Sequence, residues 1–174
     1  MCCSKYWFAL GAIFGGLGVA LGALGAHGVD EYLVDVWGAQ TKQIAGFEVP
    51  AAWKYLQDFR TAASYQTTHA LALLAVALLS MHQARRGLMV AGICFSVGIL
   101  LFCGSLYAIA LTGAVKLGMI APIGGSLLIA GWLSLATVGF QLIRESNACR
   151  SSGGVDQVPL PMSDNRRETD PLRV

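Results

Sequence analysis

Five glycines recur at helical spacing inside a stretch without charge near the N-terminus. They are Gly11, Gly15, Gly18, Gly22 and Gly25. On a helix, their alternating steps of four and three residues place all five along one line. In water each interior glycine costs a helix about 1 kcal/mol relative to alanine. In lipid the same line lets a second helix approach closely, so the stretch predicts a membrane helix around which the others pack.

The composition favours a membrane location for most of the chain. Charged residues make up 13% of its 174 residues, against about 25% in ordinary soluble domains, and the mean hydropathy is +0.59. Membrane spans are predicted at about 6–26, 60–82, 88–112 and 122–143. At about 1.5 Å per residue, these lengths suit a hydrocarbon core of about 30 Å. A signal peptide is the alternative for the first span, but the ordered glycines favour packing.

The predicted fold class is all-α, an integral membrane four-helix bundle over residues 1–146. From Arg144 the composition changes to Ser, Gly, Pro, Asp and Arg, which predicts a disordered tail over 147–174. No soluble segment reaches the roughly 40 residues usually needed to fold alone.

The long first loop carries a helical pattern of its own. Its apolar residues are Val29, Leu33, Val36 and Trp37. Their spacing predicts a short amphipathic helix that lies on the membrane surface. Residues 38–49 are expected to form a loop, and Pro50 to open a helix that continues into the second span.

Four spans place both termini on the same side of the membrane. The basic residues near span ends on that side are Lys5, Arg85, Arg86, Arg144 and Arg150. Those on the opposite side are Lys42, Lys54, Arg60 and Lys116. Basic residues near span ends favour the cytoplasm, so we expect both termini in the cytoplasm of a bacterial inner membrane.

Several motifs resemble one family of small membrane proteins. They are GALGAHG from Gly22, TAASYQTTHALALL from Thr61, GILLFCGSLYAIALTG from Gly98, PIGG from Pro122 and GW from Gly131. The resemblance is to the inner-membrane family known as domain of unknown function 423, whose animal members are called transmembrane protein 256. It implies a four-helix membrane fold over about 8–143. It implies no activity, because the family has no settled biochemical role.

Polar residues are predicted to gather where four helix ends meet at one face of the membrane. The candidates for a shared polar pocket are His27, Tyr65, Gln66, His69, Ser105 and Tyr107. His69 lies about 13 Å into the second span if that span begins at Arg60. Tyr65 and Gln66 precede it by four and three residues, so the three side chains are expected to share a face.

Two hypotheses are open for His69, which as an ionisable group inside the membrane is a candidate for function. In the leading one, a neutral His69 ties helices together in a structural or accessory protein. In the alternative, the pocket around it belongs to a small transporter or channel. We expect no enzyme, because the spans hold no nucleophile–base set, phosphate loop or paired carboxylate.

Few ligands are expected. The histidines lack a companion carboxylate in the spans, so no metal and no cofactor are predicted. The net charge of +2, without a basic stripe, argues against nucleic acid. The expected partners are the lipid bilayer and, through the glycine line, a membrane-protein partner or a second copy of the chain. Cys2 and Cys3 are either ordinary thiols or acylation sites.

Overall fold

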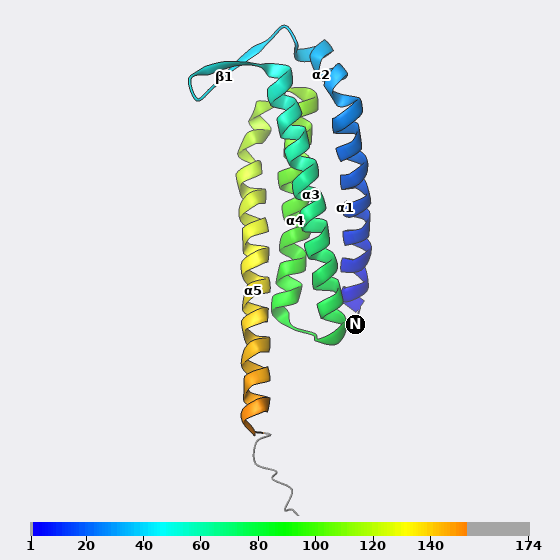
Figure 1. The fold of residues 1–174 in the computed structure, drawn as a ribbon, viewed down its shortest axis with the longest axis vertical. Helices are drawn as coiled ribbons and strands as arrows, with labels where there is room; N and C mark the ends of the chain where they lie inside the picture. The colour runs from blue at the N-terminus through cyan, green and yellow to red at the C-terminus, as the bar shows by residue number, and fades with distance from the viewer. Residues whose placement is uncertain (1, 153–174) are drawn as a thin grey trace, which may run out of the picture. The chain divides into compact units, whose positions relative to one another are not determined.

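The first and third helices pack against each other along the line of glycines. In the computed structural model, which describes residues 2–152, α1 runs Cys2–His27 and α3 runs Ala51–His82, side by side and antiparallel (Figure 1). A Cβ added at Gly18 would lie 2.6 Å from Thr67 Oγ1, which is closer than real Cβ atoms approach. The absence of side chains at this position therefore sets the distance between the two helices.

The other glycines of the line also face α3. Gly11 faces Leu74 and Ala70, Gly15 faces Ala70, Gly22 faces Ala63, and Gly25 faces Phe59. The facing residues of α3 are also three or four positions apart, so two stripes of residues meet along the length of both helices.

The fourth and fifth helices meet through close contacts of a similar kind. α4 runs Arg86–Thr112 and packs against α3, and α5 runs Ala121–Ser152. A Cβ at Gly124 would collide with the backbone of Phe102, so only glycine allows this approach. The other close contacts between these helices pair Gly98 with Leu128 and Gly131 with Phe95.

Four helices of the described chain, α1, α3, α4 and α5, are long and apolar enough to cross a membrane. The prediction of an all-α membrane protein with four spans is thus confirmed. Residues 1–140 form one compact unit, to which all contacts described here belong, and α5 from Gln141 onward belongs to a second.

The fifth helix continues past the predicted end of the fourth span. The sequence prediction placed a tail from residue 147, whereas α5 reaches Ser152. Residues 141–149 contain no glycine or proline and include good helix formers such as Leu, Arg, Glu and Ala, so a polar composition alone does not end the helix. The rest of the predicted tail, 153–174, lies outside the described residues.

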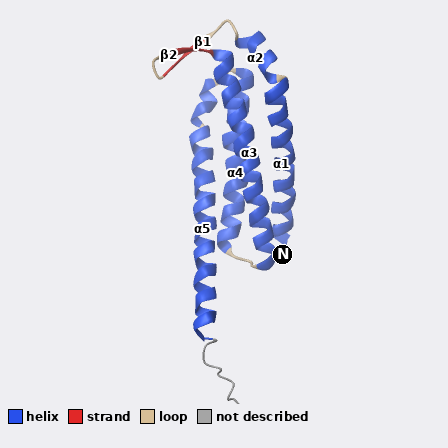
Figure 2. Ribbon diagram, in the orientation of Figure 1, coloured by secondary structure: helices blue, strands red, loops and turns tan. Residues whose placement is uncertain are grey.

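The first loop contains a β-hairpin where an irregular segment was expected. Strands β1, Thr41–Ile44, and β2, Phe47–Pro50, pair antiparallel (Figure 2). Ala45 and Gly46 at the turn have φ angles of 50° and 84°. Two residues with positive φ are typical of the tight turns that join hairpin strands. An alanine at the first of these positions is a weak turn signal, which explains why the sequence pattern did not predict the hairpin.

The predicted amphipathic helix is present but packs onto the end of the bundle. α2 runs Val29–Trp37 and is followed by the hairpin. A short 3-10 helix, η1, at Val115–Met119, connects α4 to α5. Leu33 is fully buried in a cluster with residues of α3 and α4, and the Trp37 ring lies 5.2 Å from the Tyr55 ring. The predicted helix is thus confirmed, with Leu33 facing protein and Val36 exposed; its position at the membrane surface stays a prediction.

Candidate functional site

Gln66 connects two spans in the interior of the bundle. It lies on α3 with 5% of its surface exposed, and its Nε2 donates a hydrogen bond of 2.9 Å to the Phe14 carbonyl of α1. Six residues earlier on α3, Arg60 Nε donates a bond of 3.0 Å to the Gly25 carbonyl. Both side chains bind carbonyl oxygens of α1, which lie within reach because the glycines bring the two helices close together. The two bonds therefore strengthen the contact between α1 and α3.

His69 lies on another face of α3. Its side chain is 6% exposed, and its Nδ1 lies 2.7 Å from the Tyr65 carbonyl one turn earlier. A carbonyl oxygen only accepts, so Nδ1 carries the proton and donates. In the neutral ring, Nε2 then holds a lone pair and accepts. The described residues place no hydrogen-bond partner on Nε2.

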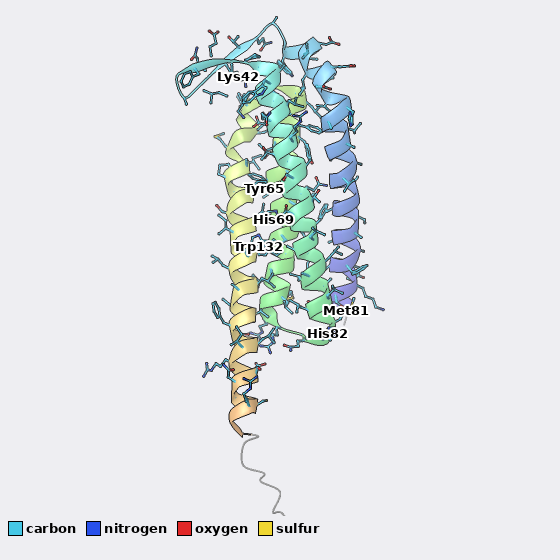
Figure 3. The ribbon with its side chains drawn as sticks, in the orientation of Figure 1. Lys42, Tyr65, His69, Met81, His82 and Trp132 are labelled. Atoms are coloured by element: carbon cyan, nitrogen blue, oxygen red, sulfur yellow. The ribbon has the colours of Figure 1, made fainter. Side chains whose placement is uncertain are left out.

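Aromatic rings surround His69. Its ring centroid is 5.7 Å from that of Tyr65, 5.8 Å from Phe95 and 6.1 Å from Trp132. Figure 3 shows Tyr65, His69 and Trp132 at neighbouring heights, far from the Lys42 end of the bundle. A cavity of about 490 Å³ opens beside them, lined among others by His69, Phe102 and Trp132. The site thus combines one buried imidazole with aromatic and aliphatic residues from three helices.

The six predicted pocket residues do not share a single cavity. Tyr65 and His69 line the cavity between α3, α4 and α5, whereas Gln66 points to α1. The cause is the helical turn of about 100° per residue: His69 lies about 40° from Tyr65, but Gln66 lies about 100° from it. The expectation that these three share a face is therefore corrected.

The remaining three predicted residues are distributed over other parts of the bundle. Ser105 Oγ donates to the Phe102 carbonyl of its own helix. The Tyr107 ring packs edge-on against Phe59 at 4.9 Å, and its buried hydroxyl has no hydrogen-bond partner in the described chain. His27 is exposed at the end of α1.

The sequence pattern did not indicate the aromatic residues that lie around Tyr65 and His69. Phe95, Phe102 and Trp132 were treated as ordinary parts of apolar spans. Phe95 and Phe102 are seven residues apart, a spacing that puts both on one face of α4, and this signal was available. Trp132 carried no comparable signal, because its position depends on how α5 packs. Within the described residues, no three His, Cys, Asp or Glu side chains are grouped as a metal site would require.

These features define the class of the protein: a small integral membrane protein of four packed helices, with an aromatic cavity beside one buried histidine. The chain belongs to the family described as "Protein of unknown function (DUF423)", whose model matches residues 21–125. The predicted resemblance is thereby confirmed.

Relatives from several bacteria cover most of the chain. A UPF0382 membrane protein of Staphylococcus epidermidis is 38% identical over 138 residues, which is 78% of this chain and 98% of that protein. The UPF0382 membrane protein YwdK of Bacillus subtilis is 34% identical over 80% of this chain and 99% of its own length. The UPF0382 inner membrane protein YgdD of Escherichia coli is 30% identical over 82% and 95%. No solved structure matches the chain.

Proposed function

We propose that this protein is a non-enzymatic accessory or structural protein of the membrane that acts through helix packing. The observation that supports this role most directly is that three polar side chains of the spans donate hydrogen bonds to neighbouring helices. Gln66 and Arg60 donate to carbonyls of α1, and Ser134 Oγ of α5 donates at 2.8 Å to the Gly87 carbonyl of α4. Their hydrogen-bonding capacity is thus used to join helices.

The outer face of α1 is where a partner helix would bind. Its exposed apolar residues include Ile13, Leu17, Val19 and Leu24. In a bilayer this surface meets lipid, and a membrane-protein partner or a second copy of the chain would replace lipid there. Purification from native membranes, followed by identification of co-purified proteins, tests this part. The proposal expects one membrane protein in a fixed ratio, or a dimer, that is lost when Leu17 and Leu24 are changed to Ala.

A substitution at His69 distinguishes a structural role of this residue from a role in transport. If His69 serves packing, His69→Ala lowers the thermal stability of the purified protein in detergent. His82→Ala is the matched control, because His82 makes the same bond to the carbonyl four residues earlier but is exposed. Stability lowered by His69→Ala, without a pH-dependent ion or solute flux from either protein in liposomes, supports the structural role.

A small transporter or channel is the second candidate, and one observation favours it. The cavity of about 490 Å³ gives His69 access to space outside the packed core. An acceptor Nε2 among aromatic rings suits a small solute that donates a hydrogen bond. Flux that disappears in a folded His69→Ala protein would establish this candidate and overturn the structural role.

The absence of enzymatic activity has its own test. Purified protein is incubated with a total lipid extract of membranes, and products are followed by mass spectrometry. We expect no turnover above that of heat-treated protein. Any lipid product formed in proportion to the amount of protein would contradict the proposal.

We place both termini in the cytoplasm of a bacterial inner membrane. The charges at the hairpin end support this orientation. There Lys54 pairs with Asp58, and Lys42 Nζ lies 4.1 Å from the centre of the Tyr55 ring. The opposite end carries the basic residues Lys5, Arg85 and Arg86. The name of the Escherichia coli relative supports the choice of membrane.

A further inference from the structure

The imidazole of His69 offers a hydrogen-bond acceptor at the cavity between α3, α4 and α5. Its Nδ1 donates to the Tyr65 carbonyl of its own helix, so Nε2, at the far end of the ring, points away from that backbone. His69 is 6% exposed and lines the cavity. Among the described residues Nε2 has no partner, and a buried acceptor without one lowers stability. A ligand that donates a hydrogen bond at this nitrogen would satisfy it.

The cavity lies near the middle of the membrane-spanning part of the bundle. Figure 3 shows His69 between the two ends that Lys42 and His82 mark. Phe102 lies about 15 Å from the end of α4, and Trp132 about 16 Å from the start of α5, against a hydrocarbon core of about 30 Å. A charged group is costly at this depth. The ligand that fits is therefore uncharged and soluble in lipid.

The cavity opens on the outer surface of the bundle. Tyr65, Ile129 and Trp132 line it and are also exposed. The described residues that line the cavity include none with a fixed charge. In a bilayer this surface meets acyl chains, so a ligand can enter sideways from the lipid. An apolar tail can then stay among the acyl chains while the polar group reaches His69.

Aromatic rings from three helices favour a flat ligand. Tyr65 of α3, Phe102 of α4 and Trp132 of α5 all line the cavity. The centre of the Tyr65 ring is 4.9 Å from that of Phe102, and the Trp132 ring is edge-on to His69 at 6.1 Å. Such rings attract another flat ring in offset-stacked or edge-on positions. The volume of about 490 Å³ lies within the range of about 300–1,000 Å³ for small-molecule sites.

We propose that this cavity binds the hydroquinone headgroup of a membrane-soluble quinol. One hydroxyl of the ring donates to His69 Nε2, the ring lies against Phe102 and Trp132, and the apolar tail extends into the lipid. The oxidised quinone carries carbonyl oxygens, which only accept, so it cannot make this bond with a neutral imidazole. This site goes beyond the packing role, because it uses a different face of α3 from the one that packs against α1, and it requires no transport.

Ligand binding to the purified protein tests the proposal. The protein in detergent, under anaerobic conditions, receives a short-tailed benzoquinol, its oxidised quinone or a short-chain diacylglycerol, and calorimetric titration gives the dissociation constants. The quinol is expected to bind about fivefold more tightly than the quinone, the effect of one net hydrogen bond. Diacylglycerol donates a hydroxyl but has no ring, and is expected to bind more weakly than the quinol by about the same factor.

A substitution at the acceptor assigns the hydrogen bond to His69. His69→Phe keeps a ring at this position but removes Nε2, so it is expected to lower the affinity for the quinol about fivefold and to leave that for the quinone unchanged. His82→Phe is the matched control, because His82 bonds the carbonyl four residues earlier in the same way but is exposed near the end of α3. It is expected to change neither affinity by more than about twofold.

A second pair of variants tests the cavity itself. An added Cβ at Gly125 lies 3.6 Å from the Phe102 ring, an ordinary contact distance, so Gly125→Leu fills the cavity without a collision at Cβ. This variant is expected to weaken binding of quinol and quinone alike, by about tenfold. Gly139→Leu makes the same change on α5 where an added Cβ meets open space. It is expected to leave both affinities within about twofold.

The opposite results would overturn the proposal. Equal binding of quinol and quinone by the unmodified protein, or binding of neither, would exclude the hydrogen bond to Nε2. Binding of diacylglycerol as tight as that of the quinol would replace the ring by any lipid hydroxyl. Equal losses within either pair of variants would place the binding elsewhere on the bundle. The first two results need no variant, so the test holds even where a substitution impairs folding, and none of them concerns the packing of α1 against α3.

Discussion

Gln66 and Tyr107 both bury a polar group in the spans, but the surroundings of the two groups differ. Gln66 donates to a carbonyl of another helix, whereas the hydroxyl of Tyr107 is buried without a partner in the described chain. A buried polar group stabilises a fold only when it is hydrogen-bonded, and an unpaired one lowers stability. The two residues should therefore respond differently when their polar atoms are removed.

Replacing Gln66 by leucine is expected to destabilise the protein. Gln66→Leu puts an apolar side chain of similar size in place of the amide and loses the bond to Phe14, so the free energy of unfolding falls by about 0.5–1.5 kcal/mol. Thr68→Val is the control, since the Thr68 hydroxyl bonds only its own helix at an exposed position. Denaturation in detergent measures both. An unchanged stability in Gln66→Leu would show that this bond does not hold α1 to α3.

Replacing Tyr107 by phenylalanine is expected to leave stability unchanged or raise it. Tyr107→Phe keeps the edge-on ring contact with Phe59 and removes the unpaired hydroxyl, whose burial costs about 1–3 kcal/mol. The same unfolding experiment measures the effect. A clear loss of stability would mean that the hydroxyl has a bonding partner in the membrane.

At the level of elements, the position of α1 against α3 depends on the absence of side chains at its glycines. The line from Gly11 to Gly25 faces α3, while Gly16 lies on another side of α1 with no atom near an added Cβ. The same change from glycine to alanine is thus a test of packing at one position and of helix propensity at the other.

Gly18→Ala and Gly16→Ala are expected to have effects of opposite sign. Gly18→Ala pushes a methyl group against Thr67 and should lower the unfolding free energy by about 1–3 kcal/mol. Gly16→Ala adds only helix propensity and should raise it by up to about 1 kcal/mol. Thermal unfolding of both variants and of the unmodified protein in the same detergent measures the two changes in stability. Equal effects would show that the line of glycines does not form the contact.

The helices could be predicted from sequence because their signals are local. Long apolar runs and glycine spacing define α1 and α4 without knowledge of their neighbours. The hairpin could not be predicted, because Ala45 takes a positive φ that only the folded segment imposes. The position of Tyr65 and His69 near each other follows from helix geometry, but the cavity beside them depends on Trp132 of α5. The candidate site thus depends on contacts between helices, which cannot be predicted from the residue pattern of any single helix.

In the whole molecule, charge divides the described bundle of residues 1–140 into two ends. The hairpin end holds all its acidic residues, one of which, Asp58, pairs with Lys54, and the other end holds Lys5, Arg85 and Arg86. Between the ends lie four apolar helices joined by glycine contacts and a few hydrogen bonds. With four helices long and apolar enough to cross a membrane, this arrangement puts the two ends on opposite sides of it.

Accessibility labelling tests this central claim most directly. Cysteine is introduced at Lys42 or at Arg85 in a chain whose natural cysteines are replaced by serine, and intact cells are treated with a thiol reagent that does not cross membranes. We expect the Lys42→Cys protein to be labelled in intact cells, and the Arg85→Cys protein only after the membrane is opened. Labelling of both positions from the same side would contradict the four-span arrangement.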